Sequence, residues 1–123
     1  MAVIRVVADL FAEDPATRAD FYRRLLGMET AMDMGWITTL TSAGSQSPQI
    51  TFAKEGGGGT PLPALSIEVD DFDDVLARAE EMGLTPEYGP VTEPWGVRRF
   101  FLRDPAGALI NILTHDASSD DEV

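Results

Sequence analysis

The sequence predicts an α+β fold made of two βαβββ modules. One order of patterns occurs twice: an apolar strand, an aspartate that opens a helix, a glycine that ends it, and three further strands. Asp14 precedes Gly27 by 13 residues, and Asp70 precedes Gly83 by the same interval, so the halves are offset by 56. The loop 54–63, with four consecutive glycines, separates the two copies. The repeat is recognised from the spacing of these Asp and Gly residues at the helix ends, because the halves share few identical side chains.

The first module begins with a strand at residues 2–8, which are apolar and rich in β-branched side chains. Asp14 then supplies an N-cap, and Pro15 suits the first position of a helix. We expect this helix to end at Leu26, with Gly27 as its C-cap. Its apolar face is predicted to contain Phe21, Tyr22, Leu25 and Leu26, and strands are predicted at 29–33, 36–41 and 48–53.

The second module repeats this plan. Residues 65–69 alternate like a half-buried strand, and a helix is predicted over 70–82 with Gly83 as its cap. The apolar side of this helix is predicted to contain Phe72, Val75, Leu76, Ala79 and Met82. A short strand at 84–88 precedes a hairpin of strands 97–103 and 108–114, whose turn is Asp104-Pro105-Ala106-Gly107.

Length and composition limit the classes of function. A chain of 123 residues predicts a single domain, here residues 1–115, followed by an acidic, disordered tail at 116–123. The net charge of −12 argues against nucleic-acid binding. The absence of cysteine excludes disulfides and thiolate chemistry, and no run is long and apolar enough for a membrane span. These features predict a cytoplasmic protein that binds neither nucleic acid nor membrane.

Three segments carry a resemblance to a known family: DPATRADFYRRLLGM at 14–28, IEVDDFDDVLARAEEMGL at 67–84 and PWGVRRFFLRDPAG at 94–107. Over residues 3–114 the chain resembles the vicinal oxygen chelate superfamily (glyoxalase I, bleomycin-resistance proteins, extradiol dioxygenases), and most closely its bleomycin-resistance branch. The resemblance implies paired modules, here 1–56 and 62–115, whose curled mixed sheets surround a cavity, with the helices on the outer face.

The metal-dependent members of that family carry His, Gln or Glu ligands at four cavity-facing positions. The resemblance places these positions at Val7, Thr51, Ala64 and Asn111. Val and Ala offer no donor atom, and the Thr hydroxyl and the Asn amide are weak neutral donors for a transition metal. We therefore expect no metal, no cofactor and no catalytic residue of the family's metal-dependent type. The open alternative is an atypical site built from Glu68, Asp9 and His115, the only histidine.

Strand alternation predicts which side chains face the cavity. Leu65, Ile67 and Val69 are expected to face the second helix, as are Ile110 and Ile112, while Ile50 and Phe52 face the first. The opposite faces then present the candidate ligand-binding residues Arg5, Thr51, Glu68 and Asn111. Trp36 and Trp95 are added as stacking residues for a flat ligand. For each Trp, core or interface packing remains an equal alternative, and Glu68 could pair with Arg5 or Arg98 only to neutralise a buried charge.

Together these features predict a homodimeric, metal-independent protein that binds a small molecule. Its function would be the sequestration of an antibiotic, another drug or a metabolite, and its acidic charge suits a flat cationic ligand. A divergent lyase, isomerase or dioxygenase-type enzyme of the same superfamily is the alternative. A structural domain with an empty cavity is a third hypothesis.

Overall fold

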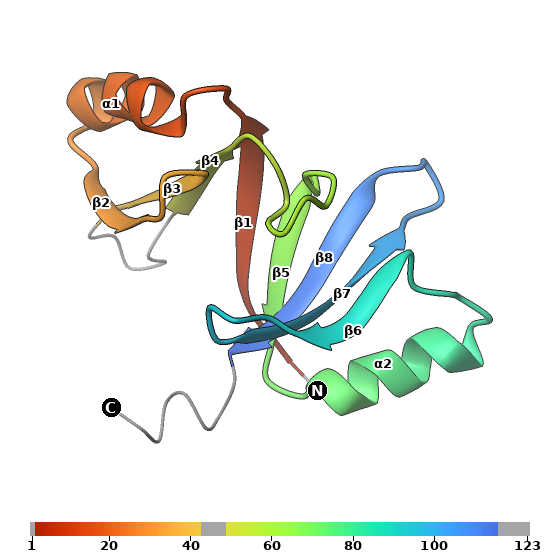
Figure 1. Cartoon of the computed structure of the whole chain (residues 1–123). Coiled ribbons are helices and arrows are strands. Elements are labelled where there is room, and N and C mark those ends of the chain that lie inside the picture. The colour runs from red at the N-terminus through yellow and green to blue at the C-terminus, as the bar shows by residue number, and fades with distance from the viewer. Residues whose placement is uncertain (1, 43–48, 116–123) are drawn as a thin grey trace. The chain divides into compact units, whose positions relative to one another are not determined.

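The computed structural model describes residues 2–42 and 49–115. The predicted tail at 116–123 and residue 48 of a predicted strand lie outside them. The elements run in the order β1 (Val3–Phe11), α1 (Pro15–Leu26), β2 (Glu29–Asp33), β3 (Ile37–Thr41), β4 (Gln49–Ala53), β5 (Leu65–Val69), α2 (Phe72–Glu81), β6 (Tyr88–Thr92), β7 (Val97–Arg103) and β8 (Leu109–His115). This alternation of one helix with four strands, repeated once, confirms the predicted α+β fold (Figure 1).

The chain forms two compact units, and the strand β1 contributes to both. One unit comprises residues 7–64, and the other combines the first six residues with residues 65–123. Val7 onward therefore belongs with α1 and β2–β4, while the start of β1 belongs with β5–β8 and α2. Each unit is a helix packed on a sheet of mixed strand direction.

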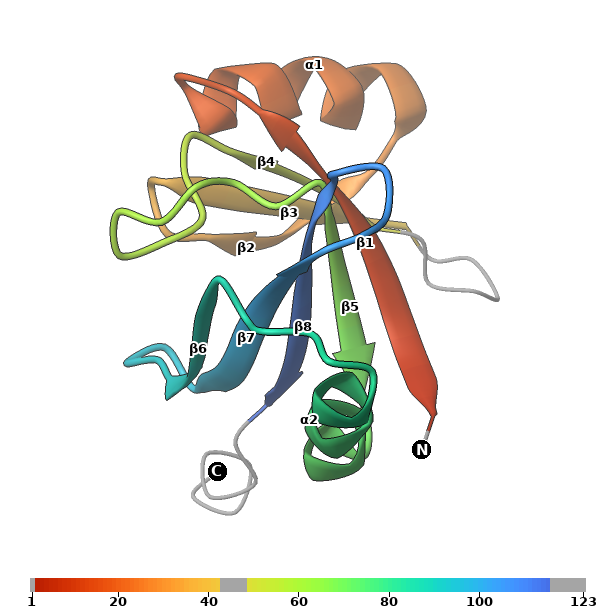
Figure 2. The same cartoon turned by 90° about the vertical axis from the view of Figure 1, so that its right-hand side faces the viewer.

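In the unit of residues 7–64, the strands follow the order β2-β3-β4-β1. β1 and β4 are parallel, with Ala8 opposite Ile50, and the other neighbours are antiparallel. The helix α1 packs on β3 and β4 (Figure 2). The hydrophobic core of this unit contains Ala12, Ala19, Met28, Leu40 and Phe52. The predicted orientation of Ile50 and Phe52 toward the first helix is confirmed.

The helix α1 begins and ends where the sequence predicts. Asp14 accepts hydrogen bonds from the Thr17 backbone and hydroxyl, and Gly27 adopts a left-handed conformation with φ 68°. These bonds hold the pKa of the Asp14 carboxyl below its ordinary value. Thus the two punctuating residues act as the helix caps that fix the length of α1.

The predicted apolar face of α1 was right for Tyr22 and wrong for the other three residues. Phe21, Leu25 and Leu26 are 60%, 65% and 57% exposed. The side that meets the sheet carries Ala19 and Tyr22, whose ring stacks on Phe52 at 5.0 Å. A small residue at 19 lets the helix approach the sheet closely, and this docking leaves the larger apolar side chains outside.

In the second unit the strands follow the order β5-β8-β7-β6, with β5 and β8 parallel and the other neighbours antiparallel. The helix α2 covers one face of this sheet (Figure 2). The hydrophobic core of this unit contains Val69, Phe72 and Phe100, with Ile67, Val75, Leu76, Leu102 and Ile112 packed around them. The predicted assignment of Ile67, Val69 and Ile112 to the helix side is confirmed.

Three local predictions in this unit were wrong. Asp71, rather than Asp70, caps α2, because Asp70 is engaged with the backbone of Ala2. Met82 lies beyond the last helical residue and is 65% exposed. The sixth strand begins at Tyr88 instead of 84, and Pro86, which lacks an N–H donor, stands in the segment that was predicted to pair.

Among the described residues, no helix is long and apolar enough to cross a membrane. The longer of the two helices, α1, has 12 residues and carries several charged side chains.

Gly89 in β6 has no room for a side chain. Its φ is 77°, and a Cβ atom there would lie 2.5 Å from the Arg99 carbonyl oxygen and 3.2 Å from Phe100 Cα. Gly107 has a similar φ of 89°, but a Cβ atom there would meet nothing within 4 Å. A comparison of alanine substitutions at the two glycines therefore separates the free-energy cost of a left-handed backbone from that of a steric clash.

We expect Gly107→Ala to lower the free energy of unfolding by about 1–2 kcal/mol, the cost of a left-handed backbone for a residue with Cβ. Gly89→Ala should lower it clearly further, because the β6–β7 pairing must also shift. Urea unfolding of both variants measures the difference. Equal destabilisation by the two substitutions would contradict the role of the Gly89 contact.

Candidate functional site: the polar face of the β5–β8 sheet

The face of the β5–β8 sheet opposite α2 carries two rows of side chains that lie in register. The first row runs across four strands through Ser66, Asn111, Phe101 and Tyr88. The second row contains Glu68, Leu113 and Arg99. Because alternate residues of a strand point to one face, these rows are the counterpart of the apolar set beneath α2. We call this set, with Arg5, Glu93, Trp95 and His115, the polar face.

Glu68 lies at the centre of a charged group on the polar face. Its Oε1 accepts a hydrogen bond from Nε of Arg5 at 2.8 Å, and its Oε2 lies 2.7 Å from Nδ1 of His115. The Glu68 side chain is 14% exposed, that of Arg5 33% and that of His115 48%. Arg5 and Glu68, two of the predicted ligand residues, are thus in direct contact, and the histidine joins them.

Asn111 supplies a buried acceptor on the same face. Its Nδ2 donates a hydrogen bond to the Ser66 hydroxyl at 3.1 Å. Its Oδ1 is fully buried, and no group of the described residues donates to it. A buried polar atom that lacks a partner is uncommon in native proteins. Asn111 is therefore the polar-face residue whose hydrogen-bonding capacity the surrounding protein leaves unfilled.

Arg99 and Glu93 form a buried ion pair at the end of the second row. Nε and Nη2 of Arg99 both lie 2.7 Å from Oε2 of Glu93, and the two side chains are only 5% and 8% exposed. The Tyr88 hydroxyl donates to the same oxygen at 2.7 Å. This bond, followed by burial, raises the pKa of Tyr88 above its ordinary value. Three donors on one carboxylate oxygen fix β6 against β7 at this point.

Trp95 belongs to the surroundings of Arg99. The guanidinium carbon of Arg99 lies 5.1 Å from the Trp95 ring, 4.8 Å from that of Phe101 and 5.3 Å from that of Tyr88. These distances are typical of cation–π contacts. The predicted stacking residue therefore already holds a cation of the protein itself, and any stacking on a ligand would use what remains of its half-buried ring.

The other two predicted ligand residues, Trp36 and Thr51, lie in the unit of residues 7–64. Thr51 is directly opposite Thr39 in the β3–β4 pairing, and their hydroxyls are hydrogen-bonded at 2.8 Å. Trp36 is half-buried immediately before β3, and its carbonyl accepts from the Lys54 backbone. Thr51 is thus satisfied by a neighbouring strand, and both residues remain predictions as ligand contacts.

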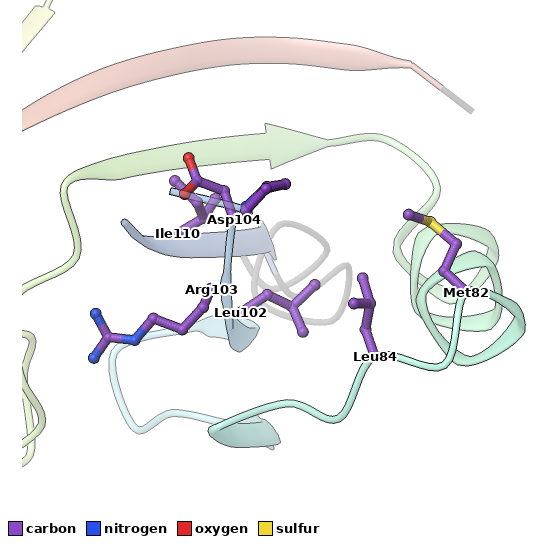
Figure 3. Close-up of a pocket in the computed structure, with 7 residues that line it drawn as sticks. Met82, Leu84, Leu102, Arg103, Asp104 and Ile110 are labelled. Carbon is purple, nitrogen blue, oxygen red and sulfur yellow. The ribbon is translucent and has the colours of Figure 1, made fainter. Parts of the chain in front are cut away.

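A separate apolar pocket opens on the helix side of the sheet, at the end of α2 (Figure 3). Its volume is about 320 Å³, and its walls are largely aliphatic. They come from Met82 and Leu84 after α2 and from the β7–β8 hairpin, namely Leu102, Arg103, Asp104, Pro105 and Ile110.

The donor set of the chain does not fit a divalent metal. Val7 and Ala64 have no donor atom, Thr51 is bonded to Thr39, and Asn111 provides a neutral amide. Nowhere in residues 2–42 and 49–115 do three or more His, Asp or Glu side chains form a group that could hold a metal ion. Of the alternative metal site, Glu68 and His115 are in contact within one unit, and Asp9 belongs to the other unit.

Comparison with known proteins adds the family. The model of the Glyoxalase/Bleomycin resistance protein/Dioxygenase superfamily matches residues 4–112. The chain belongs to this superfamily. A search of curated proteins finds no match.

Solved structures similar to this superfamily member share its fold at low sequence identity. A glyoxalase/bleomycin resistance protein/dioxygenase superfamily member from Vibrio splendidus 12B01 has a TM-score of 0.62 at 18% identity, covering 92% of this chain and 99% of that one. Methylmalonyl-CoA epimerase from Mycobacterium tuberculosis has 0.63 at 17%, covering 97% and 91%. A protein from Legionella pneumophila described as NAD-dependent benzaldehyde dehydrogenase has 0.72 at 11%, covering 91% and 100%. At these identities the likeness shows the fold alone.

Sequence reasoning about this superfamily member missed several residues of the polar face. It did not place Glu93, Arg99 or Tyr88 in the site, and it considered His115 only as part of an alternative metal site. One signal was present: in Val97–Arg103 alternation puts Arg99 on the face opposite Arg98, which pairs with Asp73 on α2. The partner of Arg99 was not readable, because Glu93 lies beyond a turn.

The raised pKa of Tyr88 predicts how stability depends on pH. The neutral phenol is the form that bonds Glu93, so its contribution is complete below pH 10.0, the ordinary value, and is lost as pH rises through the higher folded value. We expect phenolate absorbance in a Tyr22→Phe variant, where Tyr88 is the remaining tyrosine, to titrate above 10.0. Adding Glu93→Gln should move the midpoint down. A midpoint at or below 10.0 with Glu93 present would refute this interpretation.

Proposed function

We propose that this chain binds a small organic molecule on the polar face of the β5–β8 sheet without a divalent metal. The observation that carries the proposal is the buried Oδ1 of Asn111, which has no donor among the described residues. Leaving such an acceptor unpaired costs about 1–3 kcal/mol, and an N–H or O–H group of a ligand would recover that energy. The superfamily fold, in which Asn111 stands at a position of a metal ligand by resemblance, supports the same location.

The charges of the chain support a cationic ligand only at long range. On the polar face the charged side chains are already paired, Arg5 with Glu68 and Arg99 with Glu93. The net charge of −12 would raise the local concentration of a flat cation, while contacts on the face select its shape and its hydrogen-bond donors. We propose Arg5, Glu68, Asn111 and Trp95 as contacts, with Trp36 and Thr51 as further ones.

We propose sequestration as the biological role. Stoichiometric binding of an antibiotic, another drug or a metabolite in the cytoplasm needs neither a metal nor a catalytic group, and the cysteine-free composition suits that compartment. The absence of a suitable donor set at Val7 and Ala64 favours this role over metal-dependent turnover. The proposed ligand is held by its fit and by hydrogen bonds alone.

Binding is tested by thermal shift with a panel of flat antibiotics and metabolites, in buffer with and without EDTA. A ligand that binds the folded state should raise the Tm by an amount that grows with the logarithm of its concentration relative to Kd. We expect EDTA to have no effect on that shift. Loss of the shift in EDTA would contradict metal-independent binding, and absence of any shift across the panel would contradict the proposal as a whole.

Asn111→Leu provides the matched test of the site. The substitution removes the unpaired acceptor at similar volume, so we expect the Tm of the free protein to change little while the ligand-induced shift disappears. Ser66→Ala is the control, because it removes the partner of Nδ2 and leaves Oδ1 in place. If Asn111→Leu lowers the Tm and retains binding, Asn111 has a structural role only.

We also propose that the chain forms a homodimer through α1. Three large apolar side chains, Phe21, Leu25 and Leu26, are more than half exposed on this helix. Contiguous exposed apolar residues of this size commonly mark protein–protein contacts. A second copy of the chain presents the same patch, and a twofold contact of the patch with itself would bury both.

Leu25→Glu should convert the dimer to a monomer, because it places a charge in the centre of the proposed interface. Ala16→Glu is the control, since position 16 lies on the opposite side of the same helix and is exposed. Light scattering after size exclusion measures the mass of each. A monomeric parent chain, or a Leu25→Glu variant that remains dimeric, would overturn this interface.

A further inference from the structure

We propose that His115 and Glu68 form a proton-accepting dyad, which takes the proton from the hydroxyl group of a weakly acidic, phenol-type ligand. This inference deepens the proposed function and rests on it, since Asn111, Leu113 and His115 are alternate residues of β8 and point to one face. The proposed function is ligand binding on the polar face alone. The inference adds proton transfer as an activity and phenols as the class of ligand.

The carboxylate of Glu68 is fixed from both sides. Arg5 holds Oε1 at 2.8 Å, and this contact directs Oε2 toward Nδ1 of His115 at 2.7 Å. A 14% exposed carboxylate with one oxygen on a guanidinium and the other on an imidazole has little rotational freedom. For the proton transfer, Arg5 and Glu68 therefore act as positioning residues, and His115 is the group that takes the proton from the ligand.

The contact with Glu68 determines which ring nitrogen is the base. An ionised carboxylate can only accept, so the neutral imidazole must carry its hydrogen on Nδ1. The lone pair is then on Nε2, at the other edge of a ring that is 48% exposed. In the part of the chain that the structure describes, no side chain bonds Nε2. The basic nitrogen, Nε2, therefore lies on the edge of the His115 ring opposite the nitrogen that contacts Glu68.

Two further arginines of this unit are paired with side chains other than Glu68 and His115. Arg99 is closed off by Glu93, and Arg98 pairs with Asp73 on the helix side of the sheet. The neighbours of His115 on its own face are apolar, namely Leu113 two residues earlier and Val97 opposite it on β7. Among the described residues, Glu68 is the charged side chain that contacts the imidazole, and Arg5 contacts the far oxygen of Glu68.

The proposed step conserves charge and atoms. The ligand O–H bond breaks, and its proton bonds to Nε2, which gives an imidazolium and a phenolate. Nδ1–H remains bonded to Glu68, whose negative charge stabilises the imidazolium, and the imidazolium in turn stabilises the phenolate at Nε2. No metal, oxidant or second reactant takes part. A phenol-type ligand also satisfies the flat shape proposed for this site.

The dyad is tested first without any ligand. His115 is the only histidine, so every imidazole signal in a ¹⁵N-labelled sample belongs to it. Long-range ¹H–¹⁵N spectra above the pH of ring protonation distinguish the two neutral tautomers. We expect the Nδ1–H form to predominate in the parent protein, and that preference to be lost in Glu68→Gln. Predominance of the Nε2–H form would overturn the proposal.

Proton transfer is tested with a chromophoric nitrophenol at a pH below its own pKa. Adding the parent protein should increase phenolate absorbance, and the increase should be lost in His115→Gln and in Glu68→Gln. Glu87→Gln is the matched control, because it removes the same charge from the exposed Glu87–Arg103 pair of the same unit. That variant should retain the full increase.

An increase no larger than that of His115→Gln overturns the dyad, as does an increase that survives in Glu68→Gln. The proposed function fails separately, through the ligand panel and the Asn111→Leu variant. If panel ligands bind through Asn111 while nitrophenol stays protonated, the proton-transfer inference alone is wrong.

Discussion

In β5, β7 and β8 neighbouring side chains point to opposite faces, and this alternation governs the rest of the unit. The apolar half, with Ile67, Phe100 and Ile112, packs beneath α2 and supplies the core. The other half is left without a helix to cover it, so it can carry polar groups at positions that strand register fixes. A shift of one residue would exchange the two sets, placing Glu68 and Arg99 under the helix. Fold stability and the chemistry of the polar face therefore depend on one register.

The two charged clusters of the polar face differ in how deeply they are buried. Arg99 and Glu93 are almost completely buried, and Tyr88, Trp95 and Phe101 surround them. A buried pair of this kind contributes little net stability but is costly to break, so it favours one geometry over others. Glu68, by contrast, is held between two partly exposed groups, Arg5 and His115. The first cluster maintains the sheet, and the second is accessible enough to meet a ligand.

Membership of the superfamily fixes the architecture and leaves the chemistry open, because function depends on the site that a fold carries. Positions that would hold a metal by resemblance have Val, Thr, Ala and Asn, and a neutral amide with an unpaired oxygen replaces a charged ligand. An organic donor can bind such an amide, whereas a divalent ion needs charged or imidazole donors.

The sequence by itself determined the helices, most strands and the division of each strand into two faces, since caps and period-two alternation are local. Asp14 and Gly27 bound α1 as expected, and the pairing of Arg5 with Glu68 was among the alternatives. Only the tertiary structure decided which side of α1 meets its sheet, where β6 begins, and that Arg99 lies over the ring of Trp95. It also joined His115 to Glu68 across 47 residues. These outcomes depend on strand pairing and close packing between distant segments, which no local pattern encodes.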